Sequence, residues 1–503
     1  MKNFLVTVLF LALALSWLWF WTVLSKPVSL IGGPSAVRGD TIRVWVNELI
    51  TSPEEAYYYE LADCWNATHP GVKMKMSVMA SAGYESKLRV AIASGQPPDV
   101  CMVGLETLES LQYSGKYNDL SVAIPEKFFP RERLERMGRV VREATTRDGK
   151  PTVFPVWRYC YGGVILANRR MLREAGFDDT KIRLDGWTLD DFREACRKMT
   201  RDLDGDGTPD VWGFGAALVH LEHLFRNEFG PGVWGKELTD SFFKWNESAN
   251  RWEVNPRLQK EQIYQTMLLF RQLFDQDKVW SPKYLGMDWN EILNELIVHQ
   301  RLGMTFGESP WVVKLRKEIW ETEVKQGARQ GPPPDLTVVW MPTLRQGDRP
   351  VPRAGVTGFS VMKQIPYKGE AHTENAIRVA LYLTHPIHLV RSQMRSFRHL
   401  PPEPKRFARI FPELIDNNDP WVRFYNETLE SDIPLIPKPL SEKTPQAGIY
   451  RQMENELDQW FEKRGVEFIQ QVIYGKSTPR EAAKGFFTEL HAIPDKVYSK
   501  AKE

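Results

Sequence analysis

The spacing of apolar and polar residues predicts strands that alternate with helices at the start of the folded part. The first two helices carry clear end signals: Ser52 is a helix N-cap followed by proline, and Gly95 suits a helix C-terminus. The predicted elements are strands at Thr41–Val46, Val72–Val78 and Val100–Val103, and helices from Pro53 to about Asn66 and from Glu85 to Ser94. Such alternation is typical of βαβ units with a mostly parallel sheet, and it predicts the α/β class.

Downstream segments continue this pattern. Thr188 and Asp191 have capping-box spacing and open a helix to Thr200, and Thr478 with Glu481 repeats the device before a C-terminal helix that ends near His491. Apolar spacing predicts further helices at Gln262–Phe274 and Glu291–His299, and further strands at Val338–Met341 and Gly358–Met362.

Composition and charge exclude several classes of protein. The 503 residues are 42% hydrophobic and 26% charged, which fits a soluble globular chain of about three domains or two large lobes. The net charge is only +2, so no basic field exists to hold nucleic acid. The 18 Trp residues suit a cleft that stacks on flat, partly apolar ligands, as well as a core.

The N-terminus carries an export or anchor signal. An uncharged run extends from Phe4 to Ser25, long enough to cross a bilayer, and it ends in Trp residues and Lys26. An uncleaved transmembrane anchor and a signal peptide cut near Ser35 both remain open. No Cys lies nearby to be lipidated. In either case we expect an extracytoplasmic, periplasmic protein, and residues 1–39 form the signal or anchor helix and its linker.

The four cysteines give no metal pattern. Cys64, Cys101, Cys160 and Cys196 lack zinc-ligand spacing. Disulfides are permitted in an oxidising compartment, and buried free thiols are the alternative.

Ordered motifs resemble a known family. They are Ser94–Val100 (SGQPPDV), Ala167–Gly176 (ANRRMLREAG), Gly186–Phe192 (GWTLDDF), Asp202–Gly213 (DLDGDGTPDVWG), Gly303–Trp311 and Val339–Phe359. Together they resemble the extracellular solute-binding proteins of ABC transporters, in the sugar-binding group that includes maltose-binding protein. The departures are an anchor without a lipidated Cys and a greater length than that of many members.

The resemblance implies two α/β lobes that close over a ligand in a cleft between them. Crossover strands would lie near Val153–Arg158 and Gly355–Phe359. The N-lobe would comprise 40–155 plus 357–398, and the C-lobe 156–356 plus 399–503. The implied function is capture of a carbohydrate, such as a sugar, oligosaccharide or polyol, and its delivery to an ABC permease, without enzymatic activity or a cofactor. An exported carbohydrate-active enzyme and a ligand-sensing binding protein are the alternatives.

Several residues are candidates for ligand contact, each with core packing or helix capping as its alternative. Strand ends and alternation indicate Trp45, Asn47, Tyr159, Tyr161 and Trp340. Tyr84 opens a predicted helix, and Trp234 lies between glycines. By the resemblance, Glu106 takes the place of a ligand-binding carboxylate and Trp311 that of a stacking Trp. His220 and His223 follow a predicted strand without a thiol or acidic partner at metal-ligand spacing.

One loop resembles a calcium site. Asp202, Asp204, Asp206 and Asp210 lie in DLDGDGTPD, but Gly213 occupies the place of the bidentate Glu. Weak calcium binding and a solvated Asx-turn loop therefore both remain open.

Overall fold

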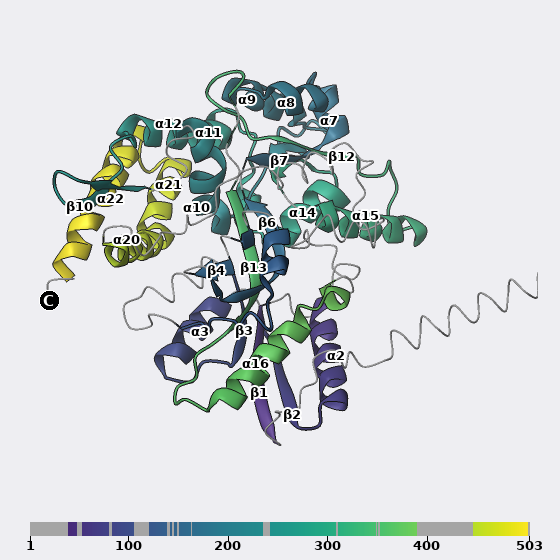
Figure 1. Cartoon of the computed structure of the whole chain (residues 1–503). Coiled ribbons are helices and arrows are strands. Elements are labelled where there is room, and N and C mark those ends of the chain that lie inside the picture. The colour runs from purple at the N-terminus through teal and green to yellow at the C-terminus, as the bar shows by residue number, and fades with distance from the viewer. Residues whose placement is uncertain are drawn as a thin grey trace, which may run out of the picture.

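The computed structural model describes residues 39–47, 53–79, 83–104, 120–137, 141–142, 145–147, 150–161, 163–234, 242–307, 310–348, 350, 353–389 and 446–500. These residues form two α/β bodies joined by two long strands, β6 (Val153–Tyr161) and β13 (Arg353–Val361), as Figure 1 shows. We call the lower body in Figure 1 the N-lobe and the upper body the C-lobe. The predicted α/β class is thus confirmed.

The N-lobe is a sheet flanked by helices. Its strand order is β2-β1-β3-β13-β6; the first three strands are parallel, and β13 pairs antiparallel with both β3 and β6. Its other elements are β1 (Asp40–Asn47), β2 (Val72–Met79), β3 (Val100–Gly104), the hairpin β4 (Thr146–Arg147) and β5 (Lys150–Pro151), α2 (Pro53–Thr68), α3 (Tyr84–Ala93), α5 (Arg131–Arg136) and α16 (Glu370–Leu383).

The C-lobe has its own sheet, in the order β12-β7-β11-β8, in which β8 and β11 are parallel and β7 is antiparallel to β11 and β12. Its strands are β7 (Val164–Asn168), β8 (Trp212–Phe214), β11 (Leu302–Phe306) and β12 (Leu336–Trp340), with the hairpin β9 (Phe243–Asn246) and β10 (Arg251–Val254) outside the sheet. Its helices include α7 (Arg169–Glu174), α8 (Asp179–Asp185), α9 (Leu189–Met199), α10 (Leu221–His223), α11 (Gly230–Trp234), α12 (Lys260–Arg271), α13 (Pro282–Leu285), α14 (Trp289–Leu293), α15 (Pro310–Lys325), α20 (Ala447–Trp460), α21 (Val466–Ile473) and α22 (Pro479–Lys500). A short 3₁₀ turn, η2 (Leu218–His220), and π-helical segments η3 (Leu224–Phe229), η5 (Gln272–Gln276), η6 (Asn294–Val298) and η8 (Phe461–Gly465) complete it.

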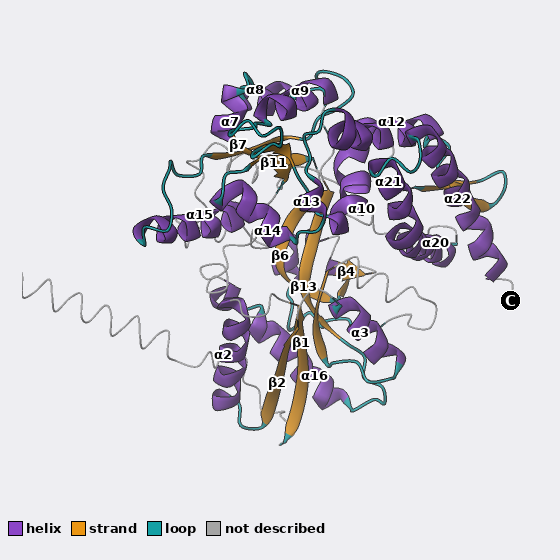
Figure 2. Cartoon of the chain, turned by 180° about the vertical axis from the view of Figure 1, so that it is seen from behind, coloured by secondary structure: helices purple, strands orange, loops and turns teal. Residues whose placement is uncertain are grey.

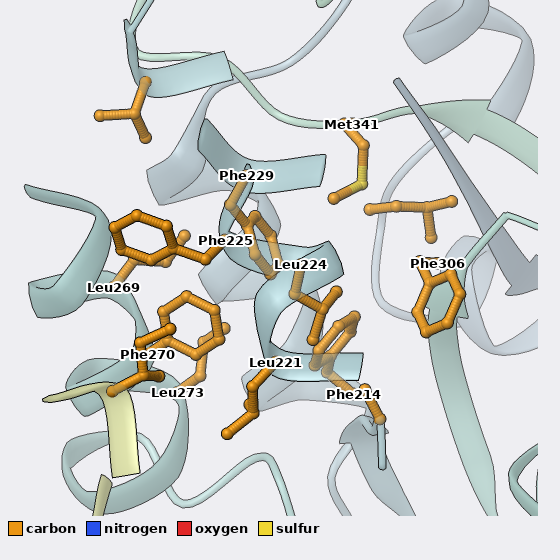
Figure 3. Packing of buried hydrophobic residues seen from close by; sticks show 14 of the residues in the cluster. Phe214, Leu221, Leu224, Phe225, Phe229, Leu269, Phe270, Leu273, Phe306 and Met341 are labelled. Atoms are coloured by element: carbon orange, nitrogen blue, oxygen red, sulfur yellow. The ribbon is translucent and has the colours of Figure 1, made fainter. Parts of the chain in front are cut away.

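Each lobe has its own hydrophobic core. The larger cluster joins buried residues between Val164 and Met341 to others between Tyr450 and Val497, so the last helices pack on the C-lobe beside α12 (Figure 2). Figure 3 shows part of it, with Phe225 of η3 near Phe270 of α12. Smaller clusters fill the N-lobe. The residue-level lobe boundaries stay a prediction.

The two predicted capping boxes form, one predicted helix end differs, and the predicted N-cap Ser52 lies outside the described residues. The capping box of Thr188 and Asp191 forms, and Thr478 caps α22 through Glu481. However, α22 does not end near His491. It continues through Pro494 to Lys500, because Ile493, Pro494 and Val497 are buried against the C-lobe and this packing outweighs the loss of a hydrogen bond at proline.

Buried charges hold α16 to the N-lobe sheet. His372 places Nδ1 2.7 Å from Asp40 Oδ1 and Nε2 3.0 Å from Asp99 Oδ1, both within hydrogen-bond distance. Asp99, which is 1% exposed, also accepts from Lys368 Nζ at 2.7 Å and from the Arg43 main-chain N–H at 2.8 Å. We call this group the α16 clasp.

The clasp shifts the pKa of two of its members, Asp99 and His372. Burial alone would raise the pKa of Asp99, but hydrogen bonds from His372, Lys368 and Arg43 outweigh it and hold the pKa well below its ordinary value. Burial alone would lower the pKa of His372, but its bonds to Asp99 and Asp40 raise it. Asp99 is therefore a carboxylate at neutral pH, and its hydrogen-bond partners favour the charged form of His372.

Three cysteines are free thiols. Cys101 and Cys196 are buried, and burial raises the pKa of both thiols, whereas Cys64 is exposed. The side chain of Cys160 lies outside the described residues.

The predicted anchor, Phe4–Ser25, lies outside the described residues. Within the part of the chain that the structure describes, no helix is both long enough and apolar enough to cross a membrane.

Candidate functional site at the strand ends between the lobes

The parallel strands of the N-lobe sheet end at one edge. Asn47, Met79 and Gly104 are their last residues, and Asn47 lies beside Met79 in the pairing of β1 with β2. Gly104 pairs with Thr357 of β13, whereas the first residue of β3, Val100, pairs with Val361. The carboxyl ends therefore point along β13 toward the C-lobe. In open α/β sheets, ligands bind outside such carboxyl ends.

The C-lobe strands end at the edge where the crossover arrives. Strand β6 leads through Gly163 into β7, whose first residue, Val164, pairs with Trp340 at the end of β12. Phe306, at the end of β11, pairs with the next residue of β7, Ile165. Strand β8 runs parallel to β11 and ends at the same edge. The carboxyl ends of the parallel strands of both sheets therefore lie on the side of the crossover strands β6 and β13, which Figure 1 shows between the lobes.

Asn47 is the N-lobe residue that best fits ligand contact. It is partly buried, and its Oδ1 is buried without a hydrogen-bond partner. An unsatisfied buried acceptor costs about 1–3 kcal/mol, which a ligand hydroxyl would recover. Trp45 lies two residues earlier on the same face of β1, partly buried against a small apolar cluster. The structure thus keeps both predicted residues near this edge.

Three other predicted residues pack in the core. Tyr84 is 1% exposed and donates its hydroxyl to the Met102 carbonyl at 2.8 Å. Trp234 is 5% exposed, and its indole N–H donates to Thr266 Oγ1 at 3.0 Å. Trp340 is 8% exposed, and its indole N–H donates to the Arg183 carbonyl at 2.9 Å. Their polar atoms are bonded within the protein, and their contact with a ligand stays a prediction.

The remaining candidates stay predictions. Tyr159 and Tyr161 lie in β6, where their main chains pair with Gly355 and Arg353. Trp311 is the second residue of α15, which follows β11. The side chains of these three residues, and the whole of Glu106, lie outside the described residues.

Four aromatic rings meet at the C-lobe edge, and sequence reasoning found only the two histidines among them. Trp289 of α14 stacks on Phe306 of β11, with ring centroids 4.1 Å apart and planes at 19°. His220, at the end of η2, lies 5.3 Å from Trp289 and 5.1 Å from Phe306. His223 lies 5.5 Å from Phe306. We call these residues the four-ring cluster.

The two histidines of the cluster differ electrostatically. Burial, with a smaller contribution from the neighbouring His223, lowers the pKa of His220 to about 4, so His220 is neutral at pH 7. Its Nδ1 is buried without a hydrogen-bond partner. His223 instead places Nε2 2.9 Å from Oε1 of the buried Glu228.

The predicted calcium loop brings its carboxylates together. Oxygens of Asp202, Asp204 and Asp210 lie within 4.8 Å of one another, and all three residues are exposed. Asp202 accepts from the Gly207 and Gly205 N–H groups, and these bonds, that from Gly207 foremost, lower its pKa. Asp206 accepts from the Thr208 N–H at 2.7 Å. This is Asx-turn bonding, and calcium binding by the loop stays a prediction.

Comparison with known families decides which kind of protein carries this arrangement. Residues 50–373 match the family model described as bacterial extracellular solute-binding protein. The chain belongs to this family. Its members act outside the cytoplasm, and the resemblance seen in the sequence motifs is thereby confirmed. No curated protein matches the chain.

Solved structures of solute-binding proteins share the two-lobed fold. An ABC transporter solute-binding protein from Thermotoga lettingae, bound with α-D-tagatose, is 16% identical, with a TM-score of 0.61 over 90% of this chain and 100% of that one. The maltose/maltodextrin-binding domain from Bdellovibrio bacteriovorus, bound to maltotriose, is 18% identical, with a TM-score of 0.60 over 92% and 100%. The maltotriose-binding protein of Thermus thermophilus is 15% identical, with a TM-score of 0.60 over 90% and 99%.

Proposed function

We propose that this solute-binding protein captures a carbohydrate between its two lobes and delivers it to the permease of an ABC transporter. The family assignment supports the binding role, and the structural neighbours were solved with tagatose and maltotriose. A binding protein needs hydrogen-bonding groups and aromatic faces in its cleft but no chemistry. The sugar itself is left open among mono- and oligosaccharides and polyols.

One observation carries the proposal. The carboxyl ends of the parallel strands of both sheets flank the crossover strands. The N-lobe edge holds a buried acceptor without a partner, Asn47 Oδ1, and the C-lobe edge holds the four-ring cluster with His220. Buried polar groups are nearly always bonded, so the unsatisfied oxygen of Asn47 points to a ligand that bonds there. Sugar hydroxyls can both donate and accept such bonds.

The alternatives use the same site differently. A glycosidase would place two carboxylates at a fixed separation across one bond. The family and its neighbours are binding proteins, which favours binding without turnover. A ligand-sensing binding protein would bind the same sugars without a permease.

The proposal includes membrane attachment. The uncharged run Phe4–Ser25 has the length of a bilayer span, and we propose that it stays attached as an anchor. Mass spectrometry of the natively expressed protein is then expected to find the original N-terminus in a detergent-extracted fraction. A mature start near Val37 in a soluble fraction would replace the anchor with a cleaved signal peptide.

The test combines ligand binding and turnover. Tagatose, maltose, maltotriose, mannotriose and a polyol panel are titrated by calorimetry and by melting temperature; ligand at 100 times Kd adds about 2.7 kcal/mol of stability. The same sugars are assayed for hydrolysis products. Binding without products supports the proposal. Hydrolysis would favour the enzyme, and a complete lack of binding and melting shifts would reject the carbohydrate reading.

A variant of Asn47 sharpens the test. Asn47→Ala removes one neutral hydrogen bond to the ligand and is expected to weaken binding about 3- to 10-fold. Stability without ligand should not fall, because the acceptor is unsatisfied there. Lys75→Ala, an exposed change on the neighbouring strand β2, is the control and should alter neither quantity. Lost apo stability with unchanged affinity would assign Asn47 a structural role.

A further inference from the structure

The four-ring cluster lies where the C-lobe strands end. Phe306 is the last residue of β11, and His220 follows β8, the parallel neighbour of β11, after a short turn. Figure 3 shows Phe306 apart from the Phe225 and Phe270 group that fills the core behind η3. Of the four rings, only Phe306 is fully enclosed, since His220, His223 and Trp289 are partly buried. The cluster is thus at the border of the core and the proposed site.

His220 is held as a hydrogen-bonding group without an internal use. Its ring contacts Trp289 and Phe306, and its Nδ1 is buried without a partner. A buried N–H without an acceptor is rarer in proteins than an acceptor with an unused lone pair. The proton therefore belongs on Nε2, and the ring offers Nε2–H as its donor.

Among the described residues, the groups that His220 contacts supply no charge for an anionic ligand. Trp289 from α14 and Phe306 from β11 are uncharged. His223, on the same helical segment, is bonded to the buried carboxylate of Glu228 from η3. An anion placed against His220 would lose hydration, meet no free cation among these groups and lie near a carboxylate. A neutral hydroxyl loses little hydration free energy there, because the imidazole N–H replaces the hydrogen bond that it received from water.

We propose that His220, framed by Trp289 and Phe306, donates a hydrogen bond to the ligand and makes the C-lobe half of the site selective for uncharged sugars over sugar acids and sugar phosphates. This inference rests on the proposed carbohydrate-binding function and adds the charge class of the substrate and the residue that sets it. The aromatic rings cover the C–H face of the sugar, and the imidazole N–H bonds a hydroxyl.

The experiment compares matched sugar pairs on the full-length protein. Calorimetric titration is run first with the sugar that binds best in the panel. Glucose is then compared with two anions, glucuronate and glucose 6-phosphate, and with glucosamine as the cationic member. We expect the uncharged sugars to bind at least about 100-fold tighter than either anion at neutral pH. Equal or tighter binding of an anion would overturn the inference while leaving carbohydrate binding intact. If no sugar of any charge binds, the proposed function fails and this inference falls with it.

Variants of His220 test its role separately. His220→Phe keeps a ring and removes the donor, and we expect it to weaken binding of the uncharged sugar about 3- to 10-fold. His220→Gln places an amide donor near the position of Nε2 and should recover most of the affinity. His491→Gln, a histidine of α22 whose pKa burial also lowers, is the matched control and should leave the affinity unchanged.

Melting temperatures of the ligand-free variants guard against a folding defect. If His220→Phe lowers affinity and His220→Gln does so equally, at unchanged melting temperature, the ring and not the donor is recognised, which contradicts the inference. Unchanged affinity in His220→Phe would also contradict it. Recovery in His220→Gln supports it even if His220→Phe is less stable, because the two variants then differ in the donor.

Discussion

Replacing Asp99 with asparagine should destabilise the N-lobe more than any exposed change of the same kind. The carboxylate accepts from His372, Lys368 and the Arg43 main chain, and only Lys368 can turn readily to water, since its side chain is 38% exposed. Asn keeps one acceptor oxygen and adds an N–H₂ that faces donors. Removing one partner of a buried charge pair costs about 3–5 kcal/mol, so Asp99→Asn should lower the free energy of unfolding of the N-lobe by that amount.

The pH dependence of the stability of the N-lobe follows from the pKa shifts of Asp99 and His372. The pKa of Asp99 is lowered on folding, so its contribution is present above its unfolded value near 4 and is lost as pH falls. The pKa of His372 is raised, so its contribution is complete below about 6.5 and is lost as pH rises through the raised value. The clasp should therefore stabilise the N-lobe most between about pH 4 and pH 6.5. Asp99→Asn should make the stability of the N-lobe less dependent on pH on the acid side of this range.

The assay must separate the lobes. Urea titration followed by hydrogen exchange of peptides from β1 and α16 reports the N-lobe, and peptides from β11 report the C-lobe. Asp63→Asn, an exposed change on α2, is the control and should stay within about 0.5 kcal/mol. A loss below about 1 kcal/mol for Asp99→Asn would show that the clasp contributes no more than a surface ion pair, and the reasoning from burial would be wrong.

Three further outcomes are expected. Trp311→Ala should weaken sugar binding about 5- to 150-fold with little change in apo stability if the indole stacks on the ligand; a loss of about 3–5 kcal/mol of apo stability at unchanged affinity would place it in the core instead. Gly358→Ala should destabilise the crossover by about 1–3 kcal/mol in urea unfolding, because its Cβ would lie 2.4 Å from the Phe154 carbonyl oxygen, whereas Gly448→Ala, with no atom within 4 Å, should be neutral or stabilising. Calcium titration of the Asp202–Asp210 loop should show a Kd no tighter than about 0.1 mM, because Gly213 replaces the bidentate Glu; micromolar binding that Asp204→Asn abolishes would contradict this.

Local signals were enough to predict most of the elements. Strand periodicity and helix caps placed β1 to β3 and the start of α9 correctly, because these features depend on neighbours in sequence. The predicted end of α22 was wrong, because burial of Ile493 and Val497 against residues distant in sequence determines where the helix ends. Strand order is also non-local: β13 enters the N-lobe sheet between β3 and β6.

The site was predictable only in part, for the same reason. The place of Asn47 at the end of a strand could be predicted, and its contact with a ligand stays a prediction. Trp234 could not be separated from a cleft residue, because its partner Thr266 lies on another helix. Trp289 and Phe306 could not be predicted as neighbours of His220 from the sequence. Only the pairing of β11 with β7 and β8 brings Phe306 to the edge beside His220. The available signal was the order Gly-Met-Thr-Phe-Gly at the start of the Gly303–Trp311 motif.

The two crossover strands are not separate tethers. β6 and β13 pair antiparallel from Arg353 with Tyr161 to Ser360 with Val153, with one irregularity at Thr357 and Gly358. Sliding one strand along the other would break this ladder of hydrogen bonds, whereas twisting the ribbon leaves it intact, and two-stranded ribbons tolerate large twist. The connection is therefore stiff to shear and soft to torsion. If the lobes move, one lobe should rotate relative to the other about the long axis of the ribbon. A ligand would then be enclosed by rotation of the lobes rather than by their translation.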